Sequence, residues 1–388
     1  ATAGNTGLGL ALIAALKGYK IILVIPDKMS REKILHLEGL GAEIILTRSD
    51  VPEGHPEYYQ DLARKIAAET PGSFLADQFS NPANPLAHRT TTAPEIWEQM
   101  KGDVDAVVAG VGSGGTLTGL AQFFKSKNPD ISMVAADPEG SVVADAILTG
   151  KYKYEGGSWL VEGVGEDFIP NNFDLSLMDD AEIVSDKEAF EVLQVLLKEE
   201  GILGGSSSGT LVAAAAKWCR KQTEPKNVVT FICDTGNKYL SKAFNKSWLH
   251  DNNLLESEKF GDLRDLISRR ADQGEMITVA PSDSLLVAYN RMRASDISQL
   301  PVIKEGDLLG IIDEEDVLIS VSKNQGTFSD EVERHMIQQL DVLQYNASED
   351  ELIGILSEGK VAIIYSEDTF IGFITKVDLI NYYRNRLN

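Results

Sequence analysis

The sequence predicts an α/β protein built on parallel sheets with helices on both faces, followed by a smaller α+β module. Three observations support this prediction. Short apolar runs alternate with helical patterns over residues 1–250, glycine-rich turns follow two buried segments, and a strand–turn–strand–helix pattern occurs twice near the C-terminus. Alternating strands and helices give parallel sheets whose two faces are both covered. Such sheets bind ligands at the carboxyl ends of their strands.

The elements of the first 250 residues follow in order from their patterns. Strands are expected at 20–25, 43–46, 105–111, 131–136 and 228–233, with helices at 8–16, 30–40, 116–125 and 185–200 between them. Ser185 and Glu188 have the spacing of a capping box, which satisfies the first free amides of a helix. Cys233 ends the last apolar run, so we expect it to be a buried strand residue.

The character of the chain changes near residue 250. Residues 251–271 are predicted to be a linker, and an internal repeat follows in 272–388. Gly310 and Gly372 lie 62 positions apart (372 − 310), and so do Asp316 and Asp378 (378 − 316). A helix precedes each copy, at 284–294 and at 349–357. One copy cannot bury its apolar face alone, so we expect the two to pack as a pair.

Composition excludes several classes of function. A formal net charge of −23 disfavours binding to nucleic acid or to an anionic membrane. The two cysteines are too few for a disulfide framework, and the five scattered histidines lack the spacing of metal ligands. No apolar run approaches the ~18 residues of a membrane span, and no signal peptide is visible. We therefore expect a cytoplasmic protein without a metal site.

Two loops are suited to anions. Gly112, Ser113, Gly114, Gly115 and Thr116 follow a buried strand and open into a helix, which directs free backbone amides at one point, as in phosphate sites. The loop contains no lysine, which argues against a Walker-type nucleotide site. At the N-terminus, Thr2, Asn5 and Thr6 place hydroxyl and amide groups at the start of a helix, a suitable seat for a carboxylate.

Four motifs occur together and in a fixed order. They are Thr-Ala-Gly-Asn-Thr-Gly at 2–7, Asp-Gln-Phe-Ser-Asn-Pro-Ala-Asn-Pro at 77–85, the 112–116 loop, and Gly-Gly-Ser at 204–206. This set resembles the fold-type II pyridoxal-phosphate enzymes of the cysteine synthase and cystathionine β-synthase family, which have a tryptophan synthase β-like fold. The C-terminal repeat resembles the paired CBS (Bateman) repeats that regulate some members.

The resemblance implies pyridoxal 5′-phosphate as cofactor and assigns roles to residues. The 112–116 loop would hold the phosphate, Asn5 would contact the phenolic oxygen of the ring, and Ser206 would meet the pyridine nitrogen. Thr2, Thr6 and Gln78 match the positions that bind the substrate carboxylate, whereas Ala3 replaces a serine common in relatives. The alternative for Ser206 and Asn5 is a role as helix caps only.

The lysine that holds the cofactor covalently in the family has no match here. In relatives it lies upstream of the first loop, and none of Lys17, Lys20, Lys28 and Lys33 stands in a comparable position. We interpret the sequence as lacking an N-terminal segment and expect the chain as given to be inactive; the catalytic lysine is therefore unassigned. A rival interpretation is a sensor of adenosyl ligands whose synthase half is vestigial.

The resemblance implies one of two β-replacement reactions. Cystathionine β-synthases condense serine with homocysteine to cystathionine, and cysteine synthases use O-acetylserine and sulfide. The motif at 79–85 favours the second, and the segment 162–168 together with the repeats favours the first. Glu162 could receive the ammonium of homocysteine, or be an ordinary charged residue. Glu166 stands where animal relatives have tyrosine.

The repeats imply a regulatory ligand. Gly372, Thr375 and Asp378 fit the Gly-x-x-Thr/Ser-x-x-Asp pattern of this module family, in which Thr and Asp contact an adenosyl ligand. S-adenosylmethionine or an adenine nucleotide is therefore expected, and the second copy should bind better, because Asp313 replaces the hydroxyl in the first. The alternative is a pair that only makes dimer contacts. Relatives are commonly dimers, so we expect a homodimer or a higher homo-oligomer.

Overall fold

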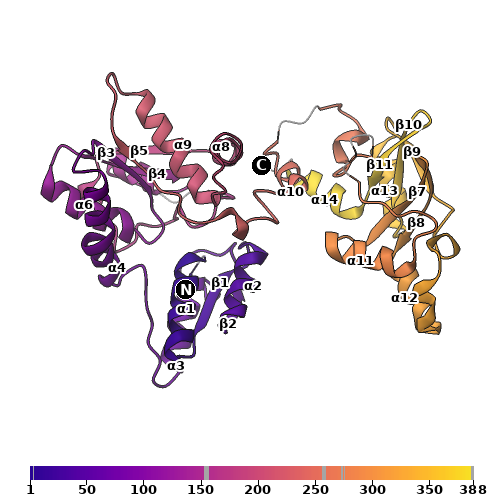
Figure 1. Ribbon diagram of the computed structural model, residues 1–388, viewed down its shortest axis with the longest axis horizontal. Coiled ribbons are helices and arrows are strands. Elements are labelled where there is room, and N and C mark those ends of the chain that lie inside the picture. Colours follow the sequence, from indigo (N-terminus) through magenta and orange to yellow (C-terminus); the bar gives the residue numbers. More distant parts are fainter. Residues whose placement is uncertain (3, 153–156, 256–258, 272–273, 275, 386–388) are drawn as a thin grey trace. The chain divides into compact units, whose positions relative to one another are not determined.

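The protein divides into two compact units, Ala1–Leu249 and His250–Asn388. The structure is a computed structural model, shown in Figure 1, and it describes residues 1–388 except 3, 153–156, 256–258, 272–273, 275 and 386–388. Parts of the predicted linker and the predicted start of the repeats at 272 therefore lie outside the described residues. We describe each unit by itself.

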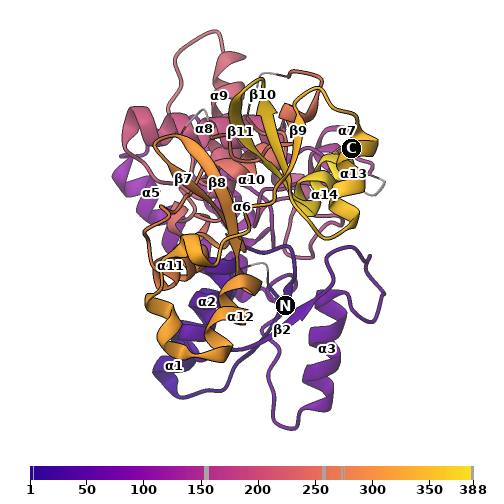
Figure 2. The ribbon, with the colours of Figure 1, turned by 90° about the vertical axis from the view of Figure 1, so that its right-hand side faces the viewer.

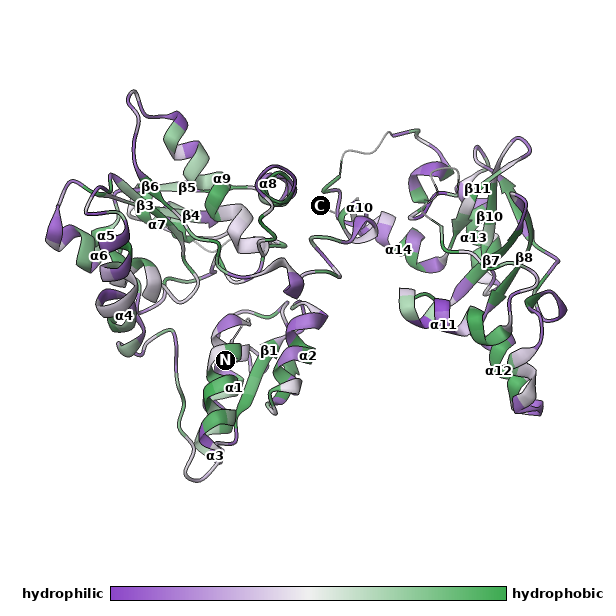
Figure 3. Ribbon diagram, in the orientation of Figure 1, coloured by the Kyte–Doolittle hydropathy of each residue, from purple (hydrophilic) through white to green (hydrophobic). Residues whose placement is uncertain are grey.

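The larger sheet of the first unit is parallel, with the strand order β5-β4-β3-β6. Its strands are β3 (Ala106–Gly110), β4 (Ser132–Pro138), β5 (Asp180–Val184) and β6 (Val228–Val229). The helices of this part are α6 (Gly115–Lys127), α7 (Val143–Thr149), α8 (Asp186–Glu200) and α9 (Ser206–Arg220). Strands β3 and β4 are almost entirely buried and apolar, as expected for parallel strands covered on both faces, and Figure 3 shows them in the hydrophobic colours.

A smaller parallel sheet lies in the N-terminal part of the same unit. It pairs β1 (Ile22–Pro26) with β2 (Glu43–Thr47). The helices α1 (Asn5–Lys17), α2 (Arg31–Gly39) and α3 (Tyr59–Glu69) belong to this part of the chain. Leu8, Leu23, Ile25 and Leu37 form its core. The core holds α1 and α2 against the sheet, which fixes the loop that precedes α1.

A nearly continuous helical segment connects the two sheets. It consists of α4 (Ala83–Ala87), a π-helical turn (His88–Thr92) and α5 (Ala93–Gln99). This segment packs closely on α6 at Gly119, where a Cβ atom would lie 2.3 Å from the carbonyl oxygen of Pro85. Only glycine permits this approach. The close packing at Gly119 brings the 78–92 region against the start of α6.

The second unit contains two similar halves. The first has α11 (Leu285–Ser295), the antiparallel pair β7 (Gln299–Lys304) and β8 (Asp307–Asp313), and α12 (Glu314–Lys323). The second has β9 (Asp341–Gln344), α13 (Glu349–Ser357), β10 (Ala362–Ser366), β11 (Thr369–Ile374) and α14 (Lys376–Asn385). Ile311 of β8 packs with Ile363 and Phe370 of the other hairpin. Figure 2 labels the strands of both halves.

Segments that precede one half pack on the other. Ile337 exchanges two backbone hydrogen bonds with Ile311, although it comes directly before the second half. Ala271 comes before the first half and donates its amide to the carbonyl of Ile371 in the second. Leu263 and Leu266 likewise belong to the core of the second half. This exchange ties the two halves together.

One predicted strand is much shorter than expected. The strand predicted at 228–233 is paired only over Val228 and Val229. The chain then leaves the sheet, and the amide of Cys233 donates to the Ser208 hydroxyl at the start of α9, 2.9 Å away. The prediction that Cys233 is a buried strand residue is wrong, because its side chain is exposed.

No helix among the described residues is both long and apolar enough to cross a bilayer.

Candidate active site

The loop from Gly112 to Thr116 connects β3 to α6. Gly114 has a φ of +78°, the left-handed region that favours glycine. A Cβ on Gly115 would lie 2.1 Å from Oδ1 of Asn84, so this position also requires glycine. Within the described part of the chain, the amides of residues 112–116 donate no hydrogen bond. Free amides at a helix N-terminus form a cradle for an anion.

Two side chains from the helical connection support this loop. Nδ2 of Asn84 donates to the Ser113 hydroxyl at 2.8 Å and to the carbonyl of Gln78 at 2.9 Å. Nε2 of His88 lies 3.1 Å from Oγ1 of Thr116. Burial lowers the pKa of His88, which keeps its ring neutral near pH 7. The sequence argument missed both roles, because neither residue has a distinctive spacing to the loop.

The N-terminal loop brings the three predicted carboxylate-binding residues together. The Thr2 hydroxyl accepts hydrogen bonds from the amides of Gly4 and Gly7, at 3.0 and 3.2 Å. The Thr6 hydroxyl donates to Oε1 of Gln78 at 2.7 Å. Nε2 of Gln78 donates to the carbonyl of residue 1 at 2.9 Å. Ala3, the predicted departure from relatives, lies outside the described residues.

Asn5 belongs to a polar network that sequence reasoning did not find. Its Nδ2 donates to Oδ2 of Asp234 at 2.9 Å, and its Oδ1 accepts from Nζ of Lys238 at 2.8 Å. The Tyr239 hydroxyl donates to the same Asp234 oxygen at 3.0 Å. Burial and the nearby Asp234 raise the pKa of Tyr239, so its hydroxyl keeps the proton. Oδ1 of Asp234 is buried without a partner among the described residues.

Ser206 is the first residue of α9 and is 1% exposed. Its hydroxyl oxygen accepts the backbone amide of Glu162 at 3.0 Å, and the hydroxyl also interacts with the phenol of Tyr239. A Cβ on the preceding Gly205 would lie 1.9 Å from Oδ1 of Asp234. The missing side chain at Gly205 therefore lets the Asn5 network approach the start of α9.

Glu162 does not face an open cleft. Its side chain is 3% exposed, and its oxygens lie 2.9 Å from Nζ of Lys33 and 2.8 Å from Nζ of Lys242. The amide of Ser30 also donates to it, at 3.4 Å. Both carboxylate oxygens are thus paired within the protein. The prediction that Glu162 receives a substrate ammonium would require this cluster to open.

Glu166 lies beside the glycine loop. Its Oε1 is 4.0 Å from the place where a Cβ on Gly112 would lie. Burial raises the pKa of Glu166 well above its usual range, and the neighbouring Asp167 raises it further, while Lys28 opposes both. The raised pKa favours the neutral carboxyl, which would repel an anion in the cradle less than a carboxylate would.

The residues of this unit fit pyridoxal phosphate. The free amides of residues 112–116 suit its phosphate, and the glycines let Gly163, Phe173 and Asn84 pack directly against the loop backbone that carries these amides. The Ser206 hydroxyl can donate to a neutral ring nitrogen. The unpartnered buried oxygen of Asp234 shows that the polar network at Asn5 is incomplete by itself.

In the second unit, Thr375 and Asp378 form a local cap. The amide and hydroxyl of Thr375 donate to Oδ2 of Asp378 at 2.7 and 2.6 Å, and the Ser268 hydroxyl contacts the other oxygen. At the equivalent place in the first half, Asp313 and Asp316 form a capping box from two carboxyl groups. Burial raises the pKa of Asp316 to about 6, and the charge of Asp313 adds to the shift.

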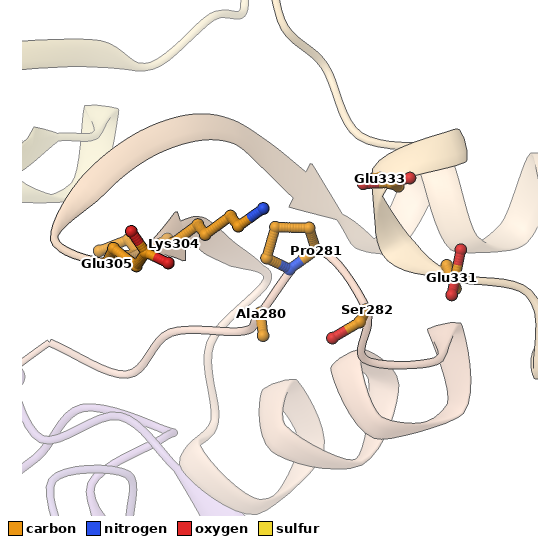
Figure 4. Close-up of a pocket in the computed structure, with 8 residues that line it drawn as sticks. Ala280, Pro281, Ser282, Lys304, Glu305, Glu331 and Glu333 are labelled. Atoms are coloured by element: carbon orange, nitrogen blue, oxygen red, sulfur yellow. The ribbon is translucent and has the colours of Figure 1, made fainter.

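Figure 4 shows a cavity of about 300 Å³ in the first half of this unit. Ala280, Pro281 and Ser282 line it together with the hairpin residues Lys304 and Glu305, and Glu331 and Glu333 lie at its other side. None of these residues belongs to the Thr375–Asp378 pattern. The described residues contain no group of three or more His, Cys, Asp or Glu that could hold a metal ion.

The paired carboxyls predict a pH-dependent stability. Because the folded state raises the pKa of Asp316 from 3.8 to about 6, ionisation opposes folding, and stability falls as pH rises from about 4 to 6. Asp313→Thr copies the Thr375–Asp378 pair, so it should stabilise α12 by about 0.5–1 kcal/mol at pH 7.5 and by less at pH 4.5. Hydrogen-exchange protection of peptides covering α12 measures this. Equal gains at both pH values would contradict the explanation.

The comparisons with known proteins identify two families along the chain. Residues 1–234 match the family described as pyridoxal-phosphate dependent enzyme, and residues 263–323 match the CBS domain. A cystathionine β-synthase of Dictyostelium discoideum is 34% identical over 98% of this chain and 78% of its own. That of Oryctolagus cuniculus is 34% identical over 99% of this chain and 73% of its own.

A cysteine synthase A of Salmonella typhi is 41% identical, but over only 62% of this chain and 75% of its own. The likeness to cystathionine β-synthases thus extends through both units, whereas the likeness to this cysteine synthase is partial. The chain therefore belongs to the pyridoxal-phosphate-dependent enzymes, in the group with a C-terminal CBS domain that includes the cystathionine β-synthases.

Proposed function

We propose that this protein condenses L-serine with L-homocysteine to L-cystathionine by a pyridoxal-phosphate-dependent β-replacement. One observation carries the choice of reaction: relatives with this activity in their name align with nearly the whole chain, second unit included. The anion cradle and the cluster of carboxylate-binding residues support the same chemistry. L-serine and L-homocysteine are the proposed small-molecule partners.

We assign the cofactor to the residues whose groups suit it. The amides of 112–116 and the Thr116 hydroxyl would hold the phosphate, Ser206 the ring nitrogen and Asn5 the phenolic oxygen. When bound, the cofactor supplies an electron sink that allows loss of the α-proton and of the β-substituent. A neutral hydroxyl at Ser206 would leave the ring nitrogen unprotonated. The ring would then be a weaker electron acceptor, which still suffices for β-replacement.

The remaining residues would bind and orient the amino acid. Thr2, Thr6 and Gln78 offer neutral donors at the N-terminus of α1, whose amides and dipole favour a carboxylate. The raised pKa of Glu166 favours its neutral form, which reduces repulsion of a phosphate nearby. We do not assign the ammonium of homocysteine to Glu162, since both of its oxygens are already paired.

Two other functions have observations in their favour. The partial likeness to cysteine synthase A, at 41% identity, favours O-acetylserine and sulfide as substrates. A sensor of adenosyl ligands with a vestigial synthase half would explain why no lysine matched the covalent position. The intact set of Asn5, Thr116 and Ser206 favours an enzyme over this sensor, because an unused cofactor site has no reason to keep all three.

Because the covalent lysine of the family has no match in this sequence, the substrate pair is tested by steady-state kinetics of the protein extended by a lysine-bearing segment and loaded with pyridoxal 5′-phosphate. We expect kcat/KM for serine with homocysteine to exceed that for O-acetylserine with sulfide at least tenfold, about 1.4 kcal/mol. The reverse preference would make it a cysteine synthase. Absence of turnover with either pair, together with binding of an adenosyl ligand, would favour the sensor.

For the second unit we propose an adenosyl ligand at Thr375 and Asp378. The Asp378 carboxylate would accept hydrogen bonds from ribose hydroxyls, and Thr375 orients it through the two hydrogen bonds described above. The paired carboxyls of Asp313 and Asp316 would oppose a nucleotide phosphate in the first half. S-adenosylmethionine has no phosphate and carries a sulfonium cation, so these carboxyl groups would repel it less than AMP or ATP.

The cytoplasmic location and the homo-oligomeric state stay predictions.

Calorimetry of the protein with S-adenosylmethionine, AMP and ATP tests the adenosyl site. Asp378→Ala should weaken binding at least tenfold, because the ribose hydroxyls lose a charged acceptor. Asp316→Ala, the equivalent change in the first half, serves as the control and should change binding less than twofold. The opposite pattern would place the ligand site in the first half. If none of the three ligands binds, the alternative that the repeats only make dimer contacts would be favoured.

A further inference from the structure

The Glu162 cluster contains more positive than negative charge. Lys33 from α2 and Lys242, which follows α9 in the chain, both pair with the one carboxylate. The side chains of Lys33 and Glu162 are 2% and 3% exposed, and that of Lys242 is 19% exposed. Two ammonium groups share one carboxylate, so these three groups together carry a surplus positive charge, and water screens the buried Lys33 and Glu162 little.

Lys33 lies directly behind the loop that precedes α1. Gly4 has a φ of +144°, and a Cβ there would lie 2.8 Å from Cδ, 3.1 Å from Cε and 3.1 Å from Nζ of Lys33. The same Nζ stands 4.5 Å from the centre of the Tyr239 ring. The missing side chain at Gly4 therefore lets the Lys33 ammonium approach the loop backbone, and the ring and Glu162 hold the ammonium in place.

The three described side chains that are predicted to bind the carboxylate at this loop, Thr2, Thr6 and Gln78, are all neutral. The Thr6 hydroxyl is hydrogen-bonded to the Gln78 amide, whereas the Thr2 hydroxyl accepts from the amides of Gly4 and Gly7. A carboxylate bound by neutral donors gains further from a buried cation nearby, since the attraction is weakly screened there. Lys242 pairs with the other oxygen of Glu162, and its ammonium also donates to the carbonyl of Lys28.

We propose that Lys33 is the electrostatic positioning residue of the carboxylate seat, with Glu162 as the counter-ion that holds its ammonium behind Gly4. Lys33 acts through the loop and need not touch the substrate. This inference rests on the proposed function, because it assumes that the loop binds the carboxylate of an amino acid. It also gives Glu162 a role that agrees with its burial.

The test compares a carboxylate with its neutral amide. Calorimetry measures the Kd of L-serine and of L-serinamide for the protein loaded with pyridoxal 5′-phosphate, and for Lys33→Met and Lys242→Met. Each variant removes one ammonium and leaves Glu162 paired with the other lysine, so the two differ only in where the charge is lost. We expect serine to bind at least tenfold tighter than serinamide in the parent protein. Lys33→Met should reduce this preference at least fivefold, and Lys242→Met less than twofold.

The outcomes separate this inference from the proposed function. If the parent prefers serine and Lys33→Met retains that preference, the role of Lys33 is overturned and the proposed function stands. An equal loss in both variants would mean that the charge of the whole cluster acts at a distance and not through the approach of Lys33 to Gly4, which also overturns it. A parent without any preference overturns the carboxylate seat itself. Lys33→Gln keeps a polar contact to Glu162 without the charge, and it should show the same loss if Lys33→Met does not fold.

Discussion

The free amides at the start of α6 are the constraint on which the first unit depends. They point at one place only because Gly114 adopts a left-handed conformation and Gly115 lets Asn84 pack against the backbone. Asn84 in turn joins the loop to the segment that carries Gln78. Through Asn84 and Gln78, the anion site at 112–116 is connected to the carboxylate seat at the start of α1.

Buried charges connect the other parts of the site. The Glu162 cluster joins α2 of the small sheet to the segment after α9, while the backbone of Glu162 contacts Ser206. Asp234 similarly joins Asn5 to Tyr239. Removing one partner of a buried pair costs more than the pair contributes. The charged groups therefore fix relative positions more than they add stability.

Local patterns predicted the local structure well. The capping box of Ser185 and Glu188 is present as expected, and the helix predicted at 349–357 has these bounds. The strand at 228–233 was wrong beyond Val229, because an apolar run does not show where a chain leaves its sheet. The roles of Asn84 and Asp234, and the pairing of Glu162, arise from contacts between distant segments, which leave no period in the sequence. Resemblance to a family supplied the rest of the candidate site.

The central claim, that residues 112–116 hold the phosphate of pyridoxal phosphate, is tested most directly by cofactor affinity. Equilibrium dialysis measures the Kd of pyridoxal 5′-phosphate for Gly115→Ala, whose Cβ would displace Asn84, and for Gly9→Ala, whose Cβ would meet nothing within 4 Å. The account predicts at least tenfold weaker binding for Gly115→Ala and an unchanged Kd for Gly9→Ala. Equal affinities of the two variants, with both folded, would contradict it.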